Sequence, residues 1–280
     1  MNQPALSHAA QQVRRFDRER FVTALFASEQ RREALMVLYA FNVEVASVRE
    51  NVREPLAGAI RLQWWRDMVA GERPGDETVR HPVAAPLGRL LAEGAVAREP
   101  LARLIDGREH DLSGEAFADL AALEAYAAAT SGELAVAALG LLGANDAETI
   151  AAGRAVGTGF ALAGLLRALP FHLSTGRVTL PEECLAAAGS SVLELAAGRT
   201  PKPAVAQAAR VVGERAATLL AEARRRRVDR QGIPALLPAT IAGKALKRLG
   251  KIGWDVFDGR SVQPATAPLR LTVNALLGRF

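Results

Sequence analysis

Hydrophobic residues recur at helical spacing along most of the chain. Apolar side chains return every three or four positions in residues 31–53, and residues 56–70 and 204–227 show the same period. Short segments that contain Pro or Gly separate these runs, as at Pro55 and Gly71. The pattern predicts an all-α protein of many helices with short connections and no internal repeat.

Two segments in the middle of the chain depart from this simple pattern. Residues 116–143 are apolar and helix-forming, but residues 130–132 (Thr-Ser-Gly) predict a hinge between two helical runs. Residues 155–181 begin as an apolar helix rich in small residues and end in Gly-Arg-Val-Thr-Leu-Pro. Pro170 lies inside this helix, and we expect it to disturb the helical turn because proline lacks a backbone donor.

The chain shows no linker and no low-complexity segment, which predicts one domain. We expect residues 1–13 to be a flexible leader and residues 14–262 to form the all-α domain. Residues 263–280 are expected to form a basic amphipathic tail. Such a tail has the composition to dock on the protein itself, on a partner or on a membrane surface.

Composition supports the helical prediction and adds a mild positive charge. Half of the 280 residues are hydrophobic, and the net charge is +5, carried mainly by arginine. This charge permits contact with phosphates or anionic lipid without selecting either. Four arginines at 224–227 end a predicted helix, where the helix dipole favours cations. Contact of these arginines with lipid or nucleic acid is the alternative, and we expect no nucleic-acid partner.

Cysteine usage and hydropathy predict the compartment. The single cysteine, Cys184, excludes an intrachain disulfide, and the scattered histidines lack zinc spacing. The N-terminal segment lacks the continuous apolar core of a signal peptide. The longest apolar run, residues 134–144, is about half as long as a bilayer-spanning helix. We therefore expect a cytoplasmic protein, either soluble or peripheral on the inner membrane.

Four segments resemble the squalene/phytoene synthase family in order and spacing. They are LYAFN (38–42) with LQWW (62–65), LIDG to DL (104–112), LR (166–167) with GRVTLP (176–181), and the weaker GWDVF to R (253–260). The resemblance implies the isoprenoid synthase fold, in which a single-domain helical bundle surrounds a central apolar cavity.

The resemblance also locates the positions of the family's metal chemistry. In active members, two helices present aspartates to Mg²⁺ ions that bind the substrate diphosphate. The resemblance places these aspartates at Ala46 and Glu50 and at Ala168 and His172. One carboxylate is a poor anchor for Mg²⁺, and imidazole prefers softer metals. We therefore expect no metal site and no cofactor, and we assign no catalytic residue.

The same region supplies candidates for binding a ligand. They are Tyr39, Asn42, Glu50, Arg167, His172 and Arg177. Arg167 and Arg177 are expected near the polar mouth of the cavity, with capping of helix carbonyls as the alternative for Arg177. An isolated histidine is more often a satisfied side chain than a ligand, and the small-residue helix can simply pack. The sequence leaves open whether the cavity is filled and whether Glu50 approaches His172.

The run LLRALPFH at 165–172 narrows the resemblance to one branch of the family. It is similar to the complex I assembly factors related to phytoene synthase and their bacterial relatives. That branch implies a non-catalytic factor that assembles or stabilises respiratory NADH dehydrogenase, with its subunits or assembly intermediates as partners. An N-terminal segment unlike an Arg-rich, acid-poor transit peptide favours a bacterial chain.

Two alternatives stay open. One is a prenyl diphosphate transferase of isoprenoid biosynthesis with an altered site, which would use Mg²⁺ and depend on Glu50. The other is a lipid-binding protein that keeps the apolar cavity without the reaction. In that case a lipid or prenyl compound is the ligand.

Overall fold

Helices form the regular structure of residues 6–52, 54–72 and 76–280, which are the residues that the computed structural model describes. No strand occurs among them, so the all-α prediction is confirmed. The helices are α1 (His8–Phe16), α2 (Arg18–Ala24), α3 (Glu29–Ala46), α4 (Pro55–Ala70), α5 (Asp76–Arg80), α6 (Ala84–Ala92), α7 (Arg98–Gly107), α8 (His110–Ser113), α9 (Leu120–Ala127), α10 (Glu133–Leu142), α11 (Ala147–Ser174), α12 (Glu182–Ala187), α13 (Val192–Ala196), α14 (Lys202–Arg224), α15 (Ile233–Leu236), α16 (Pro238–Lys251) and α17 (Pro268–Leu277). Short 3-10 turns η1 (Arg49–Asn51) and η3 (Arg230–Gly232) and the π-helical turn η2 (Ala128–Gly132) join some of them.

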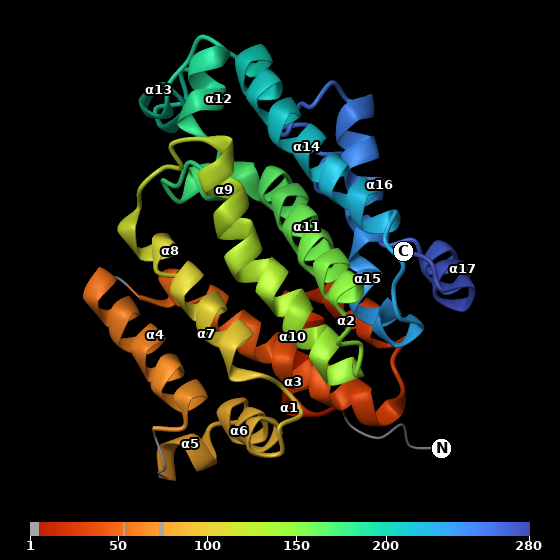
Figure 1. The fold of residues 1–280 in the computed structure, drawn as a ribbon. Coiled ribbons are helices and arrows are strands. Elements are labelled where there is room, and N and C mark those ends of the chain that lie inside the picture. The colour runs from red at the N-terminus through yellow and green to blue at the C-terminus, as the bar shows by residue number, and fades with distance from the viewer. Residues whose placement is uncertain (1–5, 53, 73–75) are drawn as a thin grey trace.

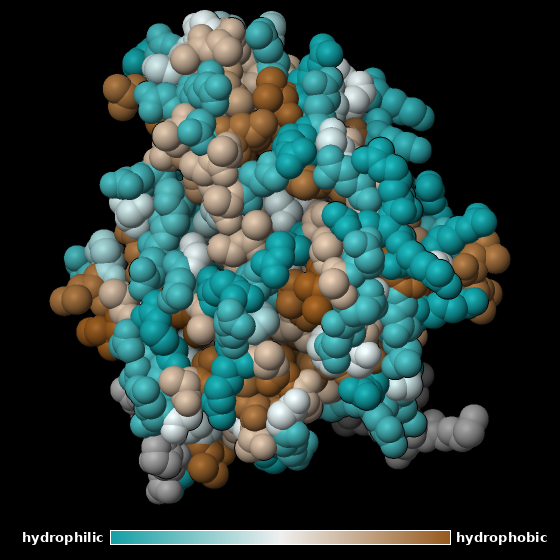
Figure 2. Space-filling view, viewed as in Figure 1, coloured by the Kyte–Doolittle hydropathy of each residue, from teal (hydrophilic) through white to brown (hydrophobic). Residues whose placement is uncertain are grey.

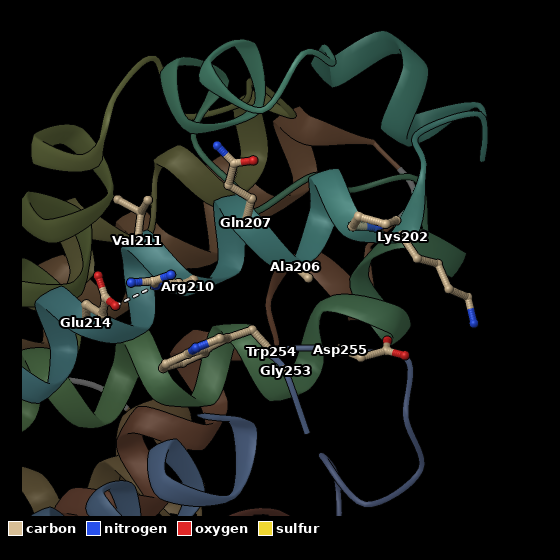
Figure 3. Close-up of a pocket in the computed structure, with 10 residues that line it drawn as sticks. Lys202, Ala206, Gln207, Arg210, Val211, Glu214, Gly253, Trp254 and Asp255 are labelled. Atoms are coloured by element: carbon tan, nitrogen blue, oxygen red, sulfur yellow. Dashed lines mark hydrogen bonds and ion pairs between the residues drawn. The ribbon is translucent and has the colours of Figure 1, made fainter. Parts of the chain in front are cut away.

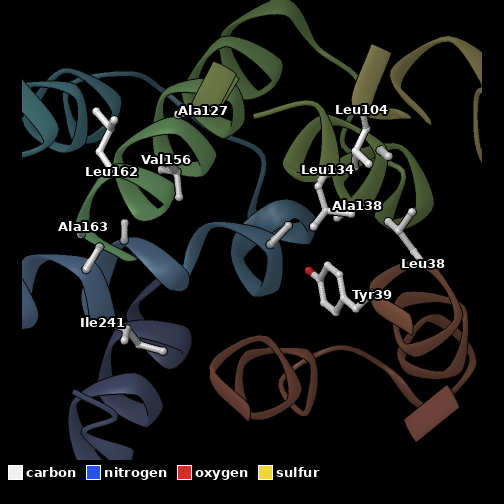
Figure 4. Close-up of a cluster of buried hydrophobic side chains, with 14 of the residues drawn as sticks. Leu38, Tyr39, Leu104, Ala127, Leu134, Ala138, Val156, Leu162, Ala163 and Ile241 are labelled. Atoms are coloured by element: carbon white, nitrogen blue, oxygen red, sulfur yellow. The ribbon is translucent and has the colours of Figure 1, made fainter. Parts of the chain in front are cut away.

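Helix α11 is the centre of the bundle. It packs against α14 and α16 on one side and against α9, η2 and α10 on the other, and Figure 1 shows it lying between α10 and α14. Its buried residues Val156 and Leu162 share one apolar core with Ile241 of α16 and Leu134 of α10 (Figure 4). The small-residue segment recognised in the sequence is therefore the element that the other helices surround.

Two helical segments are apolar and long enough to cross a membrane by length and composition. They are Leu120–Leu142, which spans α9, η2 and α10, and Ala147–Ser174, which is α11. The most apolar stretches of these segments are 67% and 56% buried inside the bundle. Core helices of this kind satisfy their apolar surface against neighbouring helices rather than against lipid.

A close backbone contact fixes how α11 approaches η2. The hinge predicted at residues 130–132 is confirmed, because the chain there forms the π-helical turn η2. The carbonyl group of Ser131 lies against Gly157, where an added methyl group would overlap it. Glycine is required at this position because no side chain fits between the two backbones.

Pro170 does not end α11, which continues to Ser174, because proline removes only one backbone donor and the last turn is closed by other bonds. One predicted helix end is wrong. The helix predicted to reach residue 53 ends at Ala46. The carbonyl oxygen of Ser47 then accepts from the N–H groups of Glu50 and Asn51 at 3.1 Å, which tightens the chain into η1.

The prediction of a flexible leader is wrong for residues 8–13. The N–H of Ala10 donates to the Ser7 hydroxyl at 3.1 Å, a cap that starts α1 at His8. Ala9, Ala10 and Val13 are buried, and α1 packs against α3. The packed part of the chain therefore begins before residue 14, and residues 1–5 lie outside the described residues.

We expect Gly157→Ala to lower the free energy of unfolding by about 1–3 kcal/mol, because overpacking forces α11 and η2 apart. Gly164→Ala is the matched control on the same helix, since no atom lies within 4 Å of an added methyl group there. That control should raise the free energy of unfolding by about 0.5–1 kcal/mol through helix propensity. Urea unfolding measures both, and equal effects of the two substitutions would contradict the proposed contact.

Candidate ligand-binding cavity

Two adjoining cavities lie where the end of α3 and η1 face the last turns of α11. The larger has a volume of about 380 Å³ and the smaller about 190 Å³, and His172 lines both. The larger is lined by Ala46, Arg49, Glu50, Val52, Phe171, His172, Thr175 and Arg177. The smaller is lined by Arg20, Asn42, Arg108, Tyr126, Thr130, Ser131, Phe160, Ala161, Gly164, Leu165, Ala168 and His172. Open space therefore remains where the segments that carry the family's motif positions face each other.

The end of α11 places Arg177 beside His172. Gly176 adopts φ 77° just beyond the last helical turn, a left-handed conformation that glycine adopts readily. The N–H of Arg177 donates to the carbonyl oxygen of His172 at 2.8 Å, and the N–H of Gly176 donates to that of Leu173 at 3.0 Å. This pair of bonds is a Schellman cap, so the Gly-Arg sequence after α11 determines where the guanidinium enters the cavity.

A buried carboxylate holds two of the cavity's arginines. Asp111 of α8 is 6% exposed and accepts from the Tyr126 hydroxyl at 2.8 Å and from Arg108 at 3.2 Å. Arg177 also donates to Asp111. Burial would lower the pKa of Arg177, but Asp111 and Tyr126 more than offset it and hold that pKa above its usual value. Asp111 therefore serves as the counter-ion of the cavity wall.

The imidazole of His172 is neutral near neutral pH. Burial, followed by repulsion from the Arg177 guanidinium, lowers the pKa of His172 to about 4, against a smaller attraction from Asp111. A neutral imidazole offers one donor and one acceptor and adds no positive charge to the wall.

The structure brings most of the predicted site residues together. Ala46, Glu50, His172 and Arg177 line the larger cavity, while Asn42, Ala168 and His172 line the smaller. Glu50 and His172 thus face the same space, although Glu50 lies in η1 and not on α3.

Two predicted ligand residues do not line either cavity. Arg167 forms an ion pair with Glu19 of α2 at 2.8 Å. Tyr39 is buried on α3, with the Arg20 guanidinium 5.9 Å from its ring centroid, and burial raises its pKa. The structure gives both residues a role in packing α2 against α3 and α11.

The sequence prediction missed the basic character of the cavity. Four arginines line the two spaces, against a single lining carboxylate, Glu50. They are Arg20, Arg49, Arg108 and Arg177. The buried amide oxygen of Asn42, which lines the smaller cavity, has no hydrogen-bond partner in the described structure.

Mg²⁺ does not fit this donor set. Among the described residues, no three His, Cys, Asp or Glu side chains are grouped closely enough to hold a metal ion. Asp111 is occupied by its three donors, and the four guanidiniums repel a divalent cation. The wall is instead suited to a ligand with an anionic group and an apolar part.

A larger open groove lies between α14 and the turn after α16. Its volume is about 1110 Å³, and Figure 3 shows Trp254 lying along α14 below the ion pair of Arg210 and Glu214. Trp254 has φ 62°, and its ring fills the space where a side chain at Gly213 would stand. Gly253, Trp254 and Asp255 of the 253–260 motif line this groove, whereas none of the predicted ligand residues does.

A family model for squalene/phytoene synthase matches residues 13–267. The chain belongs to the squalene/phytoene synthase family. Similar relatives include NADH dehydrogenase (ubiquinone) complex I, assembly factor 6, of Rattus norvegicus, which is 28% identical over 96% of this chain and 81% of that protein. The protein of the same name from Homo sapiens is 27% identical over 94% of this chain and 79% of its own length.

Solved structures of squalene/phytoene synthase relatives share the fold. A dehydrosqualene synthase superposes with a TM-score of 0.79 at 17% identity, covering 96% of this chain and 94% of its own. The squalene synthase HpnC from Alicyclobacillus acidocaldarius gives 0.74 at 20% identity, with 88% and 93% covered. These matches confirm the isoprenoid synthase fold, and at such identities they carry no conclusion about activity.

We expect Asp111→Asn to lower the free energy of unfolding by about 3–5 kcal/mol, because Arg108 and Arg177 lose a buried counter-ion. Asp106→Asn is the matched control, since the Asp106 carboxylate is 58% exposed and pairs with Arg66. An exposed pair of this kind contributes about 1 kcal/mol or less. Urea unfolding of the two variants tests the difference, and a similar loss in both would show that Asp111 does not hold the cavity wall.

Proposed function

We propose that this chain is a non-catalytic factor for the assembly or stabilisation of respiratory NADH dehydrogenase. The supporting observation is the similarity to complex I assembly factor 6. This similarity extends over 96% of this chain and is not confined to one motif. The proposed partners are subunits or assembly intermediates of that enzyme. The proposed location is the cytoplasmic face of an energy-conserving membrane, in peripheral contact.

The chemistry of the cavity supports a binding role over the family's reaction. Ionising a prenyl diphosphate requires metal ions held by protein carboxylates beside the leaving phosphates. The cavity wall supplies one lining carboxylate, Glu50, and four arginines. The fold is then a scaffold whose surfaces and cavity bind other molecules.

A lipid-like ligand in the cavity is the second candidate function. The smaller cavity is lined by apolar Phe160 and Leu165 and by Ala168, and the arginines stand beside them. An apolar chain with an anionic head group would contact both kinds of surface.

Extraction of the purified protein into organic solvent, followed by mass spectrometry, tests the lipid candidate. We expect a stoichiometric lipid from the wild-type protein and much less from Ala168→Trp, which would fill the smaller cavity. Protein that carries no lipid before or after incubation with prenyl phosphates would contradict this candidate.

Deletion of the gene tests the assembly role. We expect the deletion strain to contain less assembled NADH dehydrogenase, measured on native gels, with unchanged carotenoid and hopanoid levels. The wild-type gene and Glu50→Gln should both restore assembly, because binding does not depend on the single cavity carboxylate. Normal assembly in the deletion strain would refute the role, and a failure of Glu50→Gln alone, with altered isoprenoid levels, would favour a transferase.

A further inference from the structure

The C-terminal helix α17 is anchored to the bundle by one side only. Leu271 is fully buried, and the Asn274 amide donates to the Thr240 hydroxyl of α16 at 2.8 Å. Arg230 donates to the carbonyl oxygen of Leu276 at 2.9 Å. These contacts hold the helix in a fixed orientation, so its opposite side faces outward.

The outward side of α17 is apolar. Leu269 is 85% exposed, Val273 51%, Leu276 72% and Leu277 56%. At about 100° per residue, these four positions fall within one arc of about 100° on the side away from Leu271. Figure 2 shows the hydrophobic atoms of this helix projecting at the right edge of the molecule, beside hydrophilic neighbours. We call these four side chains the α17 face.

The α17 face has a rim of positive charge. Arg270 is exposed on the helix, and Arg279 is exposed just after it. Arg230 lies beside the helix, because it donates to the carbonyl oxygen of Leu276. The pKa of Arg224 is lowered, mainly by burial and further by repulsion from Arg270. The two arginines are therefore close to each other. None of these four arginines forms an ion pair with an acidic side chain in the described part of the chain, and residues 259–280 contain no acidic residue.

We propose that the α17 face docks on a bilayer surface that contains anionic lipids. Apolar side chains on one side of a helix enter the boundary between head groups and acyl chains, while flanking arginines bind lipid phosphates. The acid-free rim is complementary to a negatively charged membrane. The proposal rests on the proposed function, in which the protein works in peripheral contact with a membrane, and it identifies the contacting surface.

The exposed apolar residue Leu193 lacks this charge pattern. Leu193 of α13 is 78% exposed, yet it precedes Glu194, and the neighbouring α12 begins with Glu182 and Glu183. An anionic membrane would repel that corner of the molecule. Leu193 is therefore a matched control for the leucines of α17.

Co-sedimentation of the purified full chain with vesicles tests the proposal. We expect binding to vesicles of phosphatidylcholine mixed with phosphatidylglycerol, weak binding to phosphatidylcholine alone, and weaker binding at high salt. Leu269→Asp combined with Leu276→Asp should reduce the partition coefficient by about tenfold or more, because two leucines that would enter the bilayer are lost and two charges that the anionic surface repels are added. Arg270→Gln combined with Arg279→Gln should reduce binding only to the anionic vesicles.

The control Leu193→Asp should leave vesicle binding unchanged, and circular dichroism should show that every variant remains folded. Wild-type protein that stays in the supernatant with anionic vesicles would overturn the proposal, as would an equal loss of binding in Leu193→Asp. The assay contains no NADH dehydrogenase. A lack of vesicle binding would therefore contradict the proposed docking surface without contradicting the assembly role. The deletion experiment tests only the assembly role.

Discussion

The contact between the Ser131 carbonyl group and Gly157 is the constraint on which the arrangement of the bundle depends. It lets the π-helical turn η2 approach α11 at backbone distance. The same turn presents Thr130 and Ser131 to the smaller cavity, and Arg20 of α2 donates to the Ser131 hydroxyl at 2.6 Å. The lack of a side chain at Gly157 therefore determines the position of one wall of the smaller cavity as well as that of α11. A π-helical turn at such a place fits the frequent occurrence of these turns beside binding sites.

Charge neutralisation inside the fold is the second constraint. Asp111 lies at the point where Arg108, Arg177 and Tyr126 converge, and it is nearly inaccessible to solvent. A carboxylate that already accepts from three donors has little capacity left for a metal ion. Its attraction keeps two guanidiniums ordered at the cavity wall, where an unpaired buried charge would be costly. The positive charge of the cavity wall thus comes from Arg108 and Arg177, which Asp111 holds in place, and not from the positions of the family's aspartates.

The sequence predicted what depends on local pattern and missed what depends on distant contacts. Helical periodicity and the Thr-Ser-Gly break sufficed for the all-α fold and for η2. Ser47 ended α3 early through backbone bonds that periodicity does not report. The sequence left open whether Glu50 and His172 approach each other, and in the structure both line one cavity. The sequence did not predict the contacts of Asp111 with Arg108, Tyr126 and Arg177, because Arg177 lies 66 residues away from Asp111 in the sequence.

The neutral state of His172 limits the positive charge of a cavity wall that already contains four arginines. A protonated imidazole beside Arg177 would add a further cation to a wall that has one buried counter-ion. Burial, followed by repulsion from Arg177, lowers the pKa of His172 to about 4. The backbone of Arg177 is held beside His172, because its N–H donates to the carbonyl oxygen of His172 in the Schellman cap. The end of α11 therefore places the Arg177 guanidinium and a neutral His172 at the wall of the same cavity. The proposed binding role uses this arginine-rich cavity wall, and the proposed membrane contact uses the separate α17 face.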